Sequence, residues 1–281
     1  MSVLAILIPL FVREVHNRTF KVRPPKREKI LRPAGESLRE RIETLSDDLC
    51  IGLGLALLGP VVLVAAFLPL FAWQASVPIS KALILLALTL GVSVSGSYWV
   101  TRKARSLRNA RFGFEGERFV GQVLSGLSAK DCIAFHDIRL DGAENLDHVL
   151  ITPWSVFAIE TKMRRQQRSK KEGQADHEVN FDGTRLHYPF CTDGRGLQQV
   201  SRVAKWLSAY LSEALAEEIP VMPVLALPGW YVRRTGPSDV IVLNAKQLRS
   251  LTRFNPQRKA AYTPQQIKRL CFALSQRCHC Q

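Results

Sequence analysis

The chain has 281 residues, enough for one ordinary globular domain and a further segment, and its aromatic content of 8% is sufficient for a packed core. A formal net charge of +15 and a pI near 9.9 argue against cationic partners and indicate an anionic one, either nucleic acid or an acidic membrane surface. Residues 112–281 carry only about six of these surplus positive charges, so roughly nine precede residue 112.

The N-terminal region is first apolar and then basic. Met1–Val12 is too short to cross a bilayer and lacks the features of a secretory signal, so it is either an interfacial helix or a short buried segment. Residues 13–41 are rich in Lys and Arg, and Pro24, Pro25 and Pro33 break any long helix there. This stretch is either a solvated linker or a contact with anionic lipid.

Two long uncharged apolar runs follow, Ile51–Trp73 and Ala82–Val100, with a short polar connection at residues 74–81. Each is long enough to cross a membrane as a helix, and the alternative is a helical hairpin buried in a soluble protein. Lys and Arg flank both outer ends, whereas the connection holds only Lys81. The positive-inside rule therefore predicts a multi-pass protein of the cytoplasmic (inner) membrane, with both ends in the cytoplasm.

After the basic stretch 101–111, the periodicity of the apolar residues predicts alternating helices and strands. The expected helices are Arg118–Leu127, Gly196–Glu217 and Pro264–Leu274, the last with Thr263 as its cap. The expected strands are Cys132–Arg139, a hairpin over Glu144–Lys162 that turns at Thr152-Pro153-Trp154, Leu186–Phe190, Val221–Leu227 and Val240–Leu243.

The hairpin carries three charged residues on an apolar scaffold. Glu160 and Lys162 follow the apolar strand Val156–Ile159 and point to the same side of it, and Asp147 can meet Glu160 across the pair. Buried carboxylates require a partner, and Asp and Glu oxygens are the ligands that Mg²⁺ prefers. Lys162 would then orient a water molecule or stabilise charge on a phosphate. The alternative is an exposed ion pair on a surface hairpin.

The order of Asp147, a turn, an apolar strand and Glu160-Thr161-Lys162 resembles the core of the PD-(D/E)xK nucleases, and more closely the nuclease-related domain (NERD) family. Most of residues 112–250 takes part in the resemblance. The further motifs are Gly113-Phe114-Glu115-Gly116-Glu117, Leu146-Asp147-His148, Phe181-Asp182-Gly183 and the helix Gln199–Leu207.

The resemblance implies an α/β fold with a restriction-endonuclease-like mixed central sheet flanked by helices. It also implies that Glu117 is an acid near the metal, although a favourable charge in the first turn of a helix would look the same. Gln199 would hydrogen-bond near the site or lie on the surface. Arg164, Arg165 and Arg168 follow Lys162 and would contact the phosphate backbone, unless they belong to a solvated loop.

We therefore predict a membrane-anchored nuclease that hydrolyses phosphodiester bonds in nucleic acid, with DNA favoured over RNA. Its catalytic residues are Asp147, Glu160, Lys162 and Glu117, and Mg²⁺ or Mn²⁺ is held by Asp147, Glu160 and the Thr161 carbonyl. The alternative is a catalytically inactive, membrane-tethered module that binds nucleic acid or protein. The predicted parts are a basic segment 1–49, a transmembrane hairpin 50–100, a linker 101–111, the nuclease domain 112–260 and a C-terminal helix and tail 261–281.

Overall fold

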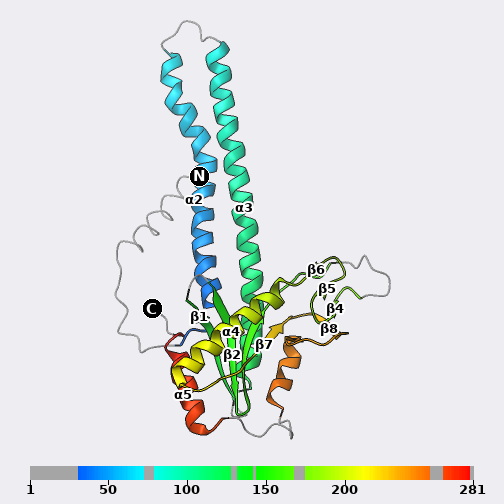
Figure 1. Cartoon of the computed structure of the whole chain (residues 1–281). Coiled ribbons are helices and arrows are strands. Elements are labelled where there is room, and N and C mark those ends of the chain that lie inside the picture. The colour runs from blue at the N-terminus through cyan, green and yellow to red at the C-terminus, as the bar shows by residue number, and fades with distance from the viewer. Residues whose placement is uncertain are drawn as a thin grey trace. The chain divides into compact units, whose positions relative to one another are not determined.

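Two long helices precede a mixed α/β region in this chain (Figure 1). The computed structural model describes residues 31–72, 79–127, 132–141, 144–167, 175–253 and 262–278. The predicted apolar segment Met1–Val12, most of the basic stretch 13–41, Arg168 and the tail from His279 lie outside these described residues.

The first two described helices contain the predicted apolar runs and extend well beyond them. Helix α2 spans Glu36–Ala72 and helix α3 spans Ile79–Ser125. Both are long and apolar enough to cross a membrane, and at most 6% of the apolar window in either helix is buried inside the structure. A core hairpin of a soluble protein would be covered by its own chain. The described residues do not provide that cover.

Helices α2 and α3 pack against each other along the hairpin. Gly52 on α2 leaves room for the ring of Trp99 on α3, a close approach that a side chain at position 52 would prevent. Just beyond the apolar runs, Lys103 Nζ donates to Asp48 Oδ2 at 2.7 Å. A small apolar cluster then joins the helices nearer the α/β region: Leu45, Leu107 and Ala110.

Helix α3 does not end with the apolar run. It continues without interruption through the basic stretch 101–111 and through most of the predicted helix Arg118–Leu127. At about 1.5 Å per residue its 47 residues reach roughly 70 Å. One continuous helix therefore joins the apolar stretch to the α/β region.

A five-stranded mixed sheet forms the centre of the α/β region, in the order β1-β2-β3-β7-β9. Strands β1, β2 and β3 are antiparallel neighbours, and β7 and β9 run parallel to β3. The strands are β1 (Ile133–Arg139), β2 (Asn145–Thr152), β3 (Ser155–Thr161), β7 (Val221–Ala226) and β9 (Ile241–Leu243). The predicted mixed sheet and the turn after Thr152 are confirmed.

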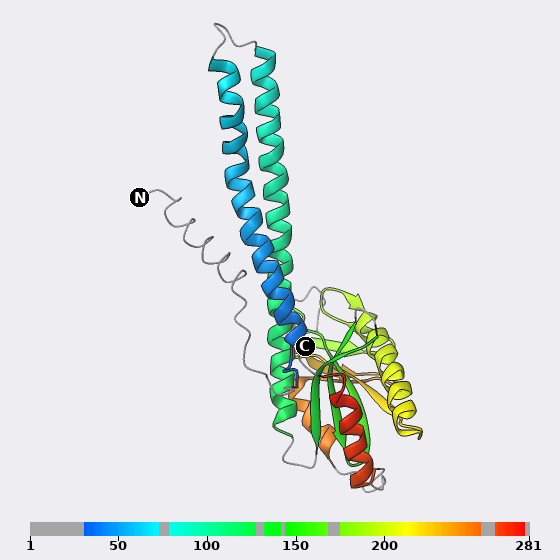
Figure 2. The same cartoon turned by 90° about the vertical axis from the view of Figure 1, so that its left-hand side faces the viewer.

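Helices cover both faces of this sheet, as Figure 2 shows. Helices α4 (Arg195–Leu215) and α5 (Pro264–Ser275) pack on one face, and the end of α3 with the 3₁₀ helix η2 (Ala245–Thr252) packs on the other. Every residue of β3 is buried, as expected for a strand covered on both faces. The end of β3 is therefore a place where a charged side chain must find partners.

A second, four-stranded sheet lies beyond the end of β3 and has the order β6-β5-β4-β8. Its strands are β4 (Glu178–Phe181), β5 (Leu186–His187), β6 (Thr192–Asp193) and β8 (Tyr231–Arg234). The predicted strand Leu186–Phe190 is shorter than expected, because Tyr188 and Phe190 leave it to pack with Trp230. The sequence did not predict β4, β6, β8 or the helix η2.

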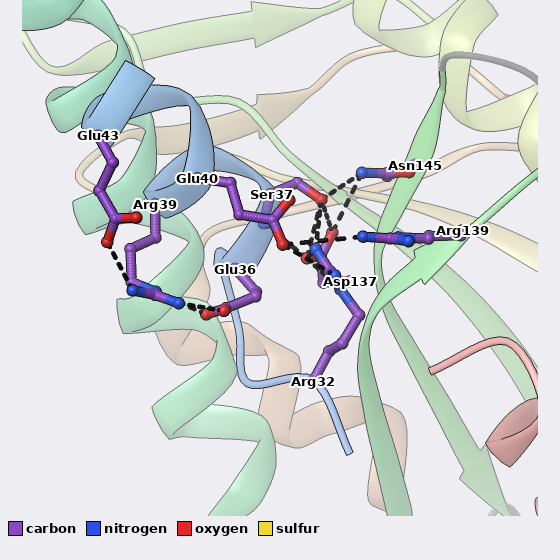
Figure 3. Close-up of polar contacts among 9 residues, drawn as sticks. All are labelled: Arg32, Glu36, Ser37, Arg39, Glu40, Glu43, Asp137, Arg139 and Asn145. Carbon is purple, nitrogen blue, oxygen red and sulfur yellow. Dashed lines mark hydrogen bonds and ion pairs between the residues drawn. The ribbon is translucent and has the colours of Figure 1, made fainter. Parts of the chain in front are cut away.

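The start of α2 is fixed to strand β1 through the buried carboxylate of Asp137 (Figure 3). Arg32 donates to Asp137 Oδ2 from Nε at 2.9 Å and from Nη2 at 2.7 Å. The backbone N–H of Ser37, in the first turn of α2, donates to the same oxygen at 2.7 Å. Asp137 thus caps the helix and pairs with a cation, although its φ of +51° is a left-handed conformation that few residues adopt.

We expect Asp137→Ala to lower the free energy of unfolding by about 3–5 kcal/mol, because it leaves the buried Arg32 without its main partner. Thermal unfolding of the full chain in detergent, followed by circular dichroism, measures this loss. The matched control is Asp141→Ala, which breaks an exposed ion pair with Arg277 and should cost less than about 1 kcal/mol. Equal effects of the two variants would show that the Arg32–Asp137 pair does not fix α2.

Candidate active site

Three predicted residues meet where strand β3 ends. The side chain of Glu160 is 3% exposed, and its Oε1 accepts from Lys162 Nζ at 2.8 Å and from Gln199 Nε2 at 2.7 Å. Lys162 directly follows β3 and its side chain is 39% exposed, so its ammonium group lies between the buried Glu160 carboxylate and the solvent. Gln199 comes from the first turns of α4, which packs on this face of the sheet.

Asp147 lies beside Glu160 on the neighbouring strand. The antiparallel register that pairs His148 with Ile159 places Asp147 opposite Glu160. Asp147 Oδ2 accepts the backbone N–H of Thr161 at 2.7 Å, which fixes the carboxylate at the end of β3. The structure therefore places Asp147, Glu160 and Lys162 together at the end of β3.

Glu117 reaches the same group of charges from helix α3. The helix lies close to the end of β3 because Gly116 has no side chain, and a Cβ there would collide with Met163. Burial, followed by the negative charges of Asp137 and Glu160, raises the pKa of Glu117 to about 8. Glu117 is therefore near enough to the predicted metal ligands to repel them when it is ionised.

Burial and neighbouring charges also shift the pKa values of Asp147, Glu160 and Lys162. Burial, then Glu160 and Glu117, raise the pKa of Asp147 well above its ordinary value. Burial also raises the pKa of Glu160, although Lys162 opposes this effect. Burial alone would lower the pKa of Lys162, but its carboxylate neighbours outweigh burial and raise it. Lys162 therefore stays a cation, while burial and mutual repulsion disfavour the ionised forms of the carboxylates, and a bound cation would favour them.

The donor set suits a hard divalent cation. Glu160 Oε2 is buried and has no hydrogen-bond partner, so one carboxylate oxygen is left for a ligand. Within the described ranges, no three His, Cys, Asp or Glu side chains are arranged to hold a metal ion. The predicted ligand set needs only the carboxylates of Asp147 and Glu160, because its third ligand is the backbone carbonyl of Thr161.

The predicted phosphate-binding arginines differ in their surroundings. Arg164 pairs with Asp193 and lies over the ring of Tyr188, 4.8 Å from its centroid, so it belongs to the second sheet. Arg165 is exposed and lies over the ring of Phe112 on α3 at 5.2 Å. Arg168 lies outside the part of the chain that the structure describes.

The sequence did not predict a pair of histidines behind the site. His148 Nδ1 lies 2.9 Å from His136 Nδ1 on the sheet face that α3 covers, and Gly121 of α3 lies against both rings. Burial, and for His148 also its histidine neighbour, lowers both pKa values, so one neutral ring donates to the other. The two rings meet because His136 on β1 lies opposite His148 on β2. This pairing of strands becomes known only from the fold, so the sequence alone does not predict the contact.

One comparison with known proteins covers the stretch of chain that contains these residues. The family model described as NERD, nuclease-related domain, matches residues 112–228. The matched stretch contains Glu117, Asp147, Glu160, Lys162 and Gln199, and it leaves out α2 and most of α3. No curated protein and no solved structure matches the chain.

We expect Glu117 to make stability depend on pH when no divalent cation is added. Its carboxyl group ionises in the unfolded chain near pH 4.5 but in the folded chain only near pH 8, so stability falls as the pH rises through this window. Between pH 6 and pH 8.5 the wild type should lose about 2–3 kcal/mol more than Glu117→Gln. Chemical unfolding at several pH values measures the difference.

The control for this experiment is Glu115→Gln, which removes an exposed carboxylate from the same helix and should keep the wild-type pH dependence. A Glu117→Gln protein with the wild-type pH dependence would show that Glu117 ionises normally.

Proposed function

We propose that the chain is a membrane-anchored, metal-dependent nuclease that hydrolyses phosphodiester bonds in nucleic acid. The main support is the meeting of Asp147, Glu160 and Lys162 at one end of a buried strand, inside the stretch that matches the nuclease-related domain. The net charge of +15 suits an anionic polymer as substrate.

In this proposal Asp147, Glu160 and the Thr161 carbonyl hold Mg²⁺ or Mn²⁺, and Glu117 supports the ion. The unpartnered Glu160 Oε2 and the raised pKa values of the carboxylates favour this role, because both features reflect negative charge without enough compensation. When bound, such an ion stabilises charge on phosphate oxygens and makes water a better nucleophile.

Lys162 acts as a hydrogen-bond donor in this proposal. Its raised pKa keeps the ammonium protonated, so it orients the attacking water and stabilises charge on the phosphate, and it does not remove a proton. Gln199 holds Glu160 in place by donating to the oxygen that also accepts from Lys162. Arg165 contacts the phosphate backbone beside the site.

Helices α2 and α3 cross the cytoplasmic membrane in this proposal, with the connection between them on the far side. The exposed apolar surface of both helices and the Lys and Arg residues at their outer ends support this orientation. The nuclease domain then lies in the cytoplasm, where nucleic acid is available.

We expect the full chain in detergent to cleave a labelled nucleic acid in the presence of Mg²⁺ or Mn²⁺. Asp147→Asn, Glu160→Gln and Lys162→Met should each slow cleavage by about 10²-fold or more, because each removes charge from the reacting phosphate or its ion. Initial rates on single- and double-stranded DNA and RNA measure the effect. The control is Glu213→Gln on the exposed side of α4, which should cleave at the wild-type rate.

Circular dichroism of each variant separates loss of activity from loss of folding. Binding of nucleic acid without cleavage under either metal ion would overturn the proposal in favour of an inactive binding module. The absence of both binding and cleavage would favour a module that recognises a protein.

A further inference from the structure

We propose that one face of α3, between the apolar run and the α/β region, binds the substrate strand through its phosphates and leads it from the active site toward the membrane. This α3 basic face consists of Arg105 and Arg108 of α3 together with Arg165, which follows β3 and lies over the ring of Phe112 of α3. The proposal rests on the proposed function and extends the substrate-binding surface to residues outside the stretch 112–228.

Helix geometry puts these residues on one side of α3. Positions 105, 108, 112 and 116 are spaced by three, four and four residues, so they follow one face of the helix. The ring of Phe112 carries the guanidinium of Arg165, and Gly116 accommodates Met163. Arg165 and Met163 both belong to the segment that follows β3, so this face of α3 lies against the residues just after Lys162.

The opposite side of α3 is occupied. Leu107 and Ala110 pack in the cluster that joins α3 to α2, and Lys103 pairs with Asp48 of α2. The α3 basic face therefore lies on the side of α3 opposite α2, and α2 does not cover it.

The cationic groups of this face are available for a ligand. Arg105, Arg108 and Arg165 are exposed, and none of them forms an ion pair with another described residue. Lys103 and Arg164, by contrast, are engaged with Asp48 and Asp193. Glu115, the first acidic residue that follows Arg105 and Arg108 along α3, is exposed to solvent.

Distance along the helix favours nucleic acid over lipid as the source of the phosphates. Counted from Val100, the last residue of the apolar run, Arg105 is about 8 Å, Arg108 about 12 Å and Phe112 about 18 Å farther along α3. The headgroup layer on each side of a bilayer is only about 5–8 Å thick. Arg108 and Arg165 therefore lie beyond the headgroups, and only Arg105 borders them.

The spacing also suits a nucleic-acid strand. From Arg105 to Phe112 the α3 basic face extends about 10 Å, which corresponds to roughly three nucleotides at about 3.4 Å each along a strand. Guanidinium groups that contact only phosphates add affinity without selecting a base sequence. The face would therefore strengthen binding of strands that continue past the active site.

The test compares Arg105→Gln/Arg108→Gln with the wild type, using the full chain in nanodiscs of neutral lipid and EDTA to prevent cleavage. The dissociation constant of a fluorescent single-stranded 20-mer (about 20 nucleotides) is measured by anisotropy at several salt concentrations. Loss of two phosphate contacts should make the slope of log K against log salt less steep by about 1.4. Between 50 and 200 mM salt, the wild type should lose about sevenfold more affinity than the variant.

The charge-matched control is Lys205→Gln/Lys268→Gln, which removes two exposed cations from α4 and α5, across the sheet from α3. It should keep the wild-type slope. A wild-type slope for Arg105→Gln/Arg108→Gln would overturn the proposal. A change of slope that occurs only in nanodiscs of anionic lipid would also overturn it, because the arginines would then act through lipid headgroups.

The measurement separates this inference from the proposed function. If the wild type binds the strand but never cleaves it with Mg²⁺ or Mn²⁺, the hydrolysis proposal fails and the slope still decides the role of the α3 basic face. If the wild type cleaves and the slope is unchanged, only the α3 basic face is wrong. If the wild type binds no nucleic acid, both proposals fail.

Discussion

The constraint on which this structure depends is the burial of Glu160 at the end of a strand that is covered on both faces. An ionised carboxylate in such a place is costly unless cations and hydrogen-bond donors surround it. Lys162 and Gln199 both donate to Oε1, so they fix the turn of the chain after β3 and the position of α4. The same contacts therefore stabilise both the fold and the arrangement of the site. They use only Oε1 of Glu160, and Oε2 has no hydrogen-bond partner.

Helix α3 connects the carboxylate site directly to the apolar hairpin. The same continuous helix carries the apolar run, the α3 basic face and Glu117, which lies about 26 Å along the helix beyond Val100. At the other side of the site, Asp137 ties the start of α2 to β1 through Arg32 and Ser37. Both helices of the hairpin are therefore attached to the region around the carboxylates, α3 as the helix that carries Glu117 and α2 through Asp137.

The sequence predicted those parts whose signals are local. The β2–β3 hairpin follows from two apolar runs and a turn at Pro153, and α4 follows from a row of leucines at helical spacing. The strands of the second sheet have only two to four residues, and apart from β5, which lies in the predicted strand Leu186–Phe190, they are too short for an alternating pattern to be recognised. The pairing of Arg32 with Asp137 joins residues 105 positions apart, and no pattern in one sequence predicts such a contact.

The electrostatics of the buried carboxylates bear on the proposed metal-binding role of the site. A buried ion pair can often be replaced by apolar residues of similar volume without loss of stability, so a structural role alone does not explain why Glu160 and Lys162 are charged. Glu160, Asp147 and Glu117 each carry a raised pKa, which means that their ionised forms destabilise the folded chain as it stands. A cation held by Asp147 and Glu160, with Glu117 nearby, would offset this penalty. The unfavourable electrostatics of these carboxylates are therefore the physical argument for the proposed metal ion.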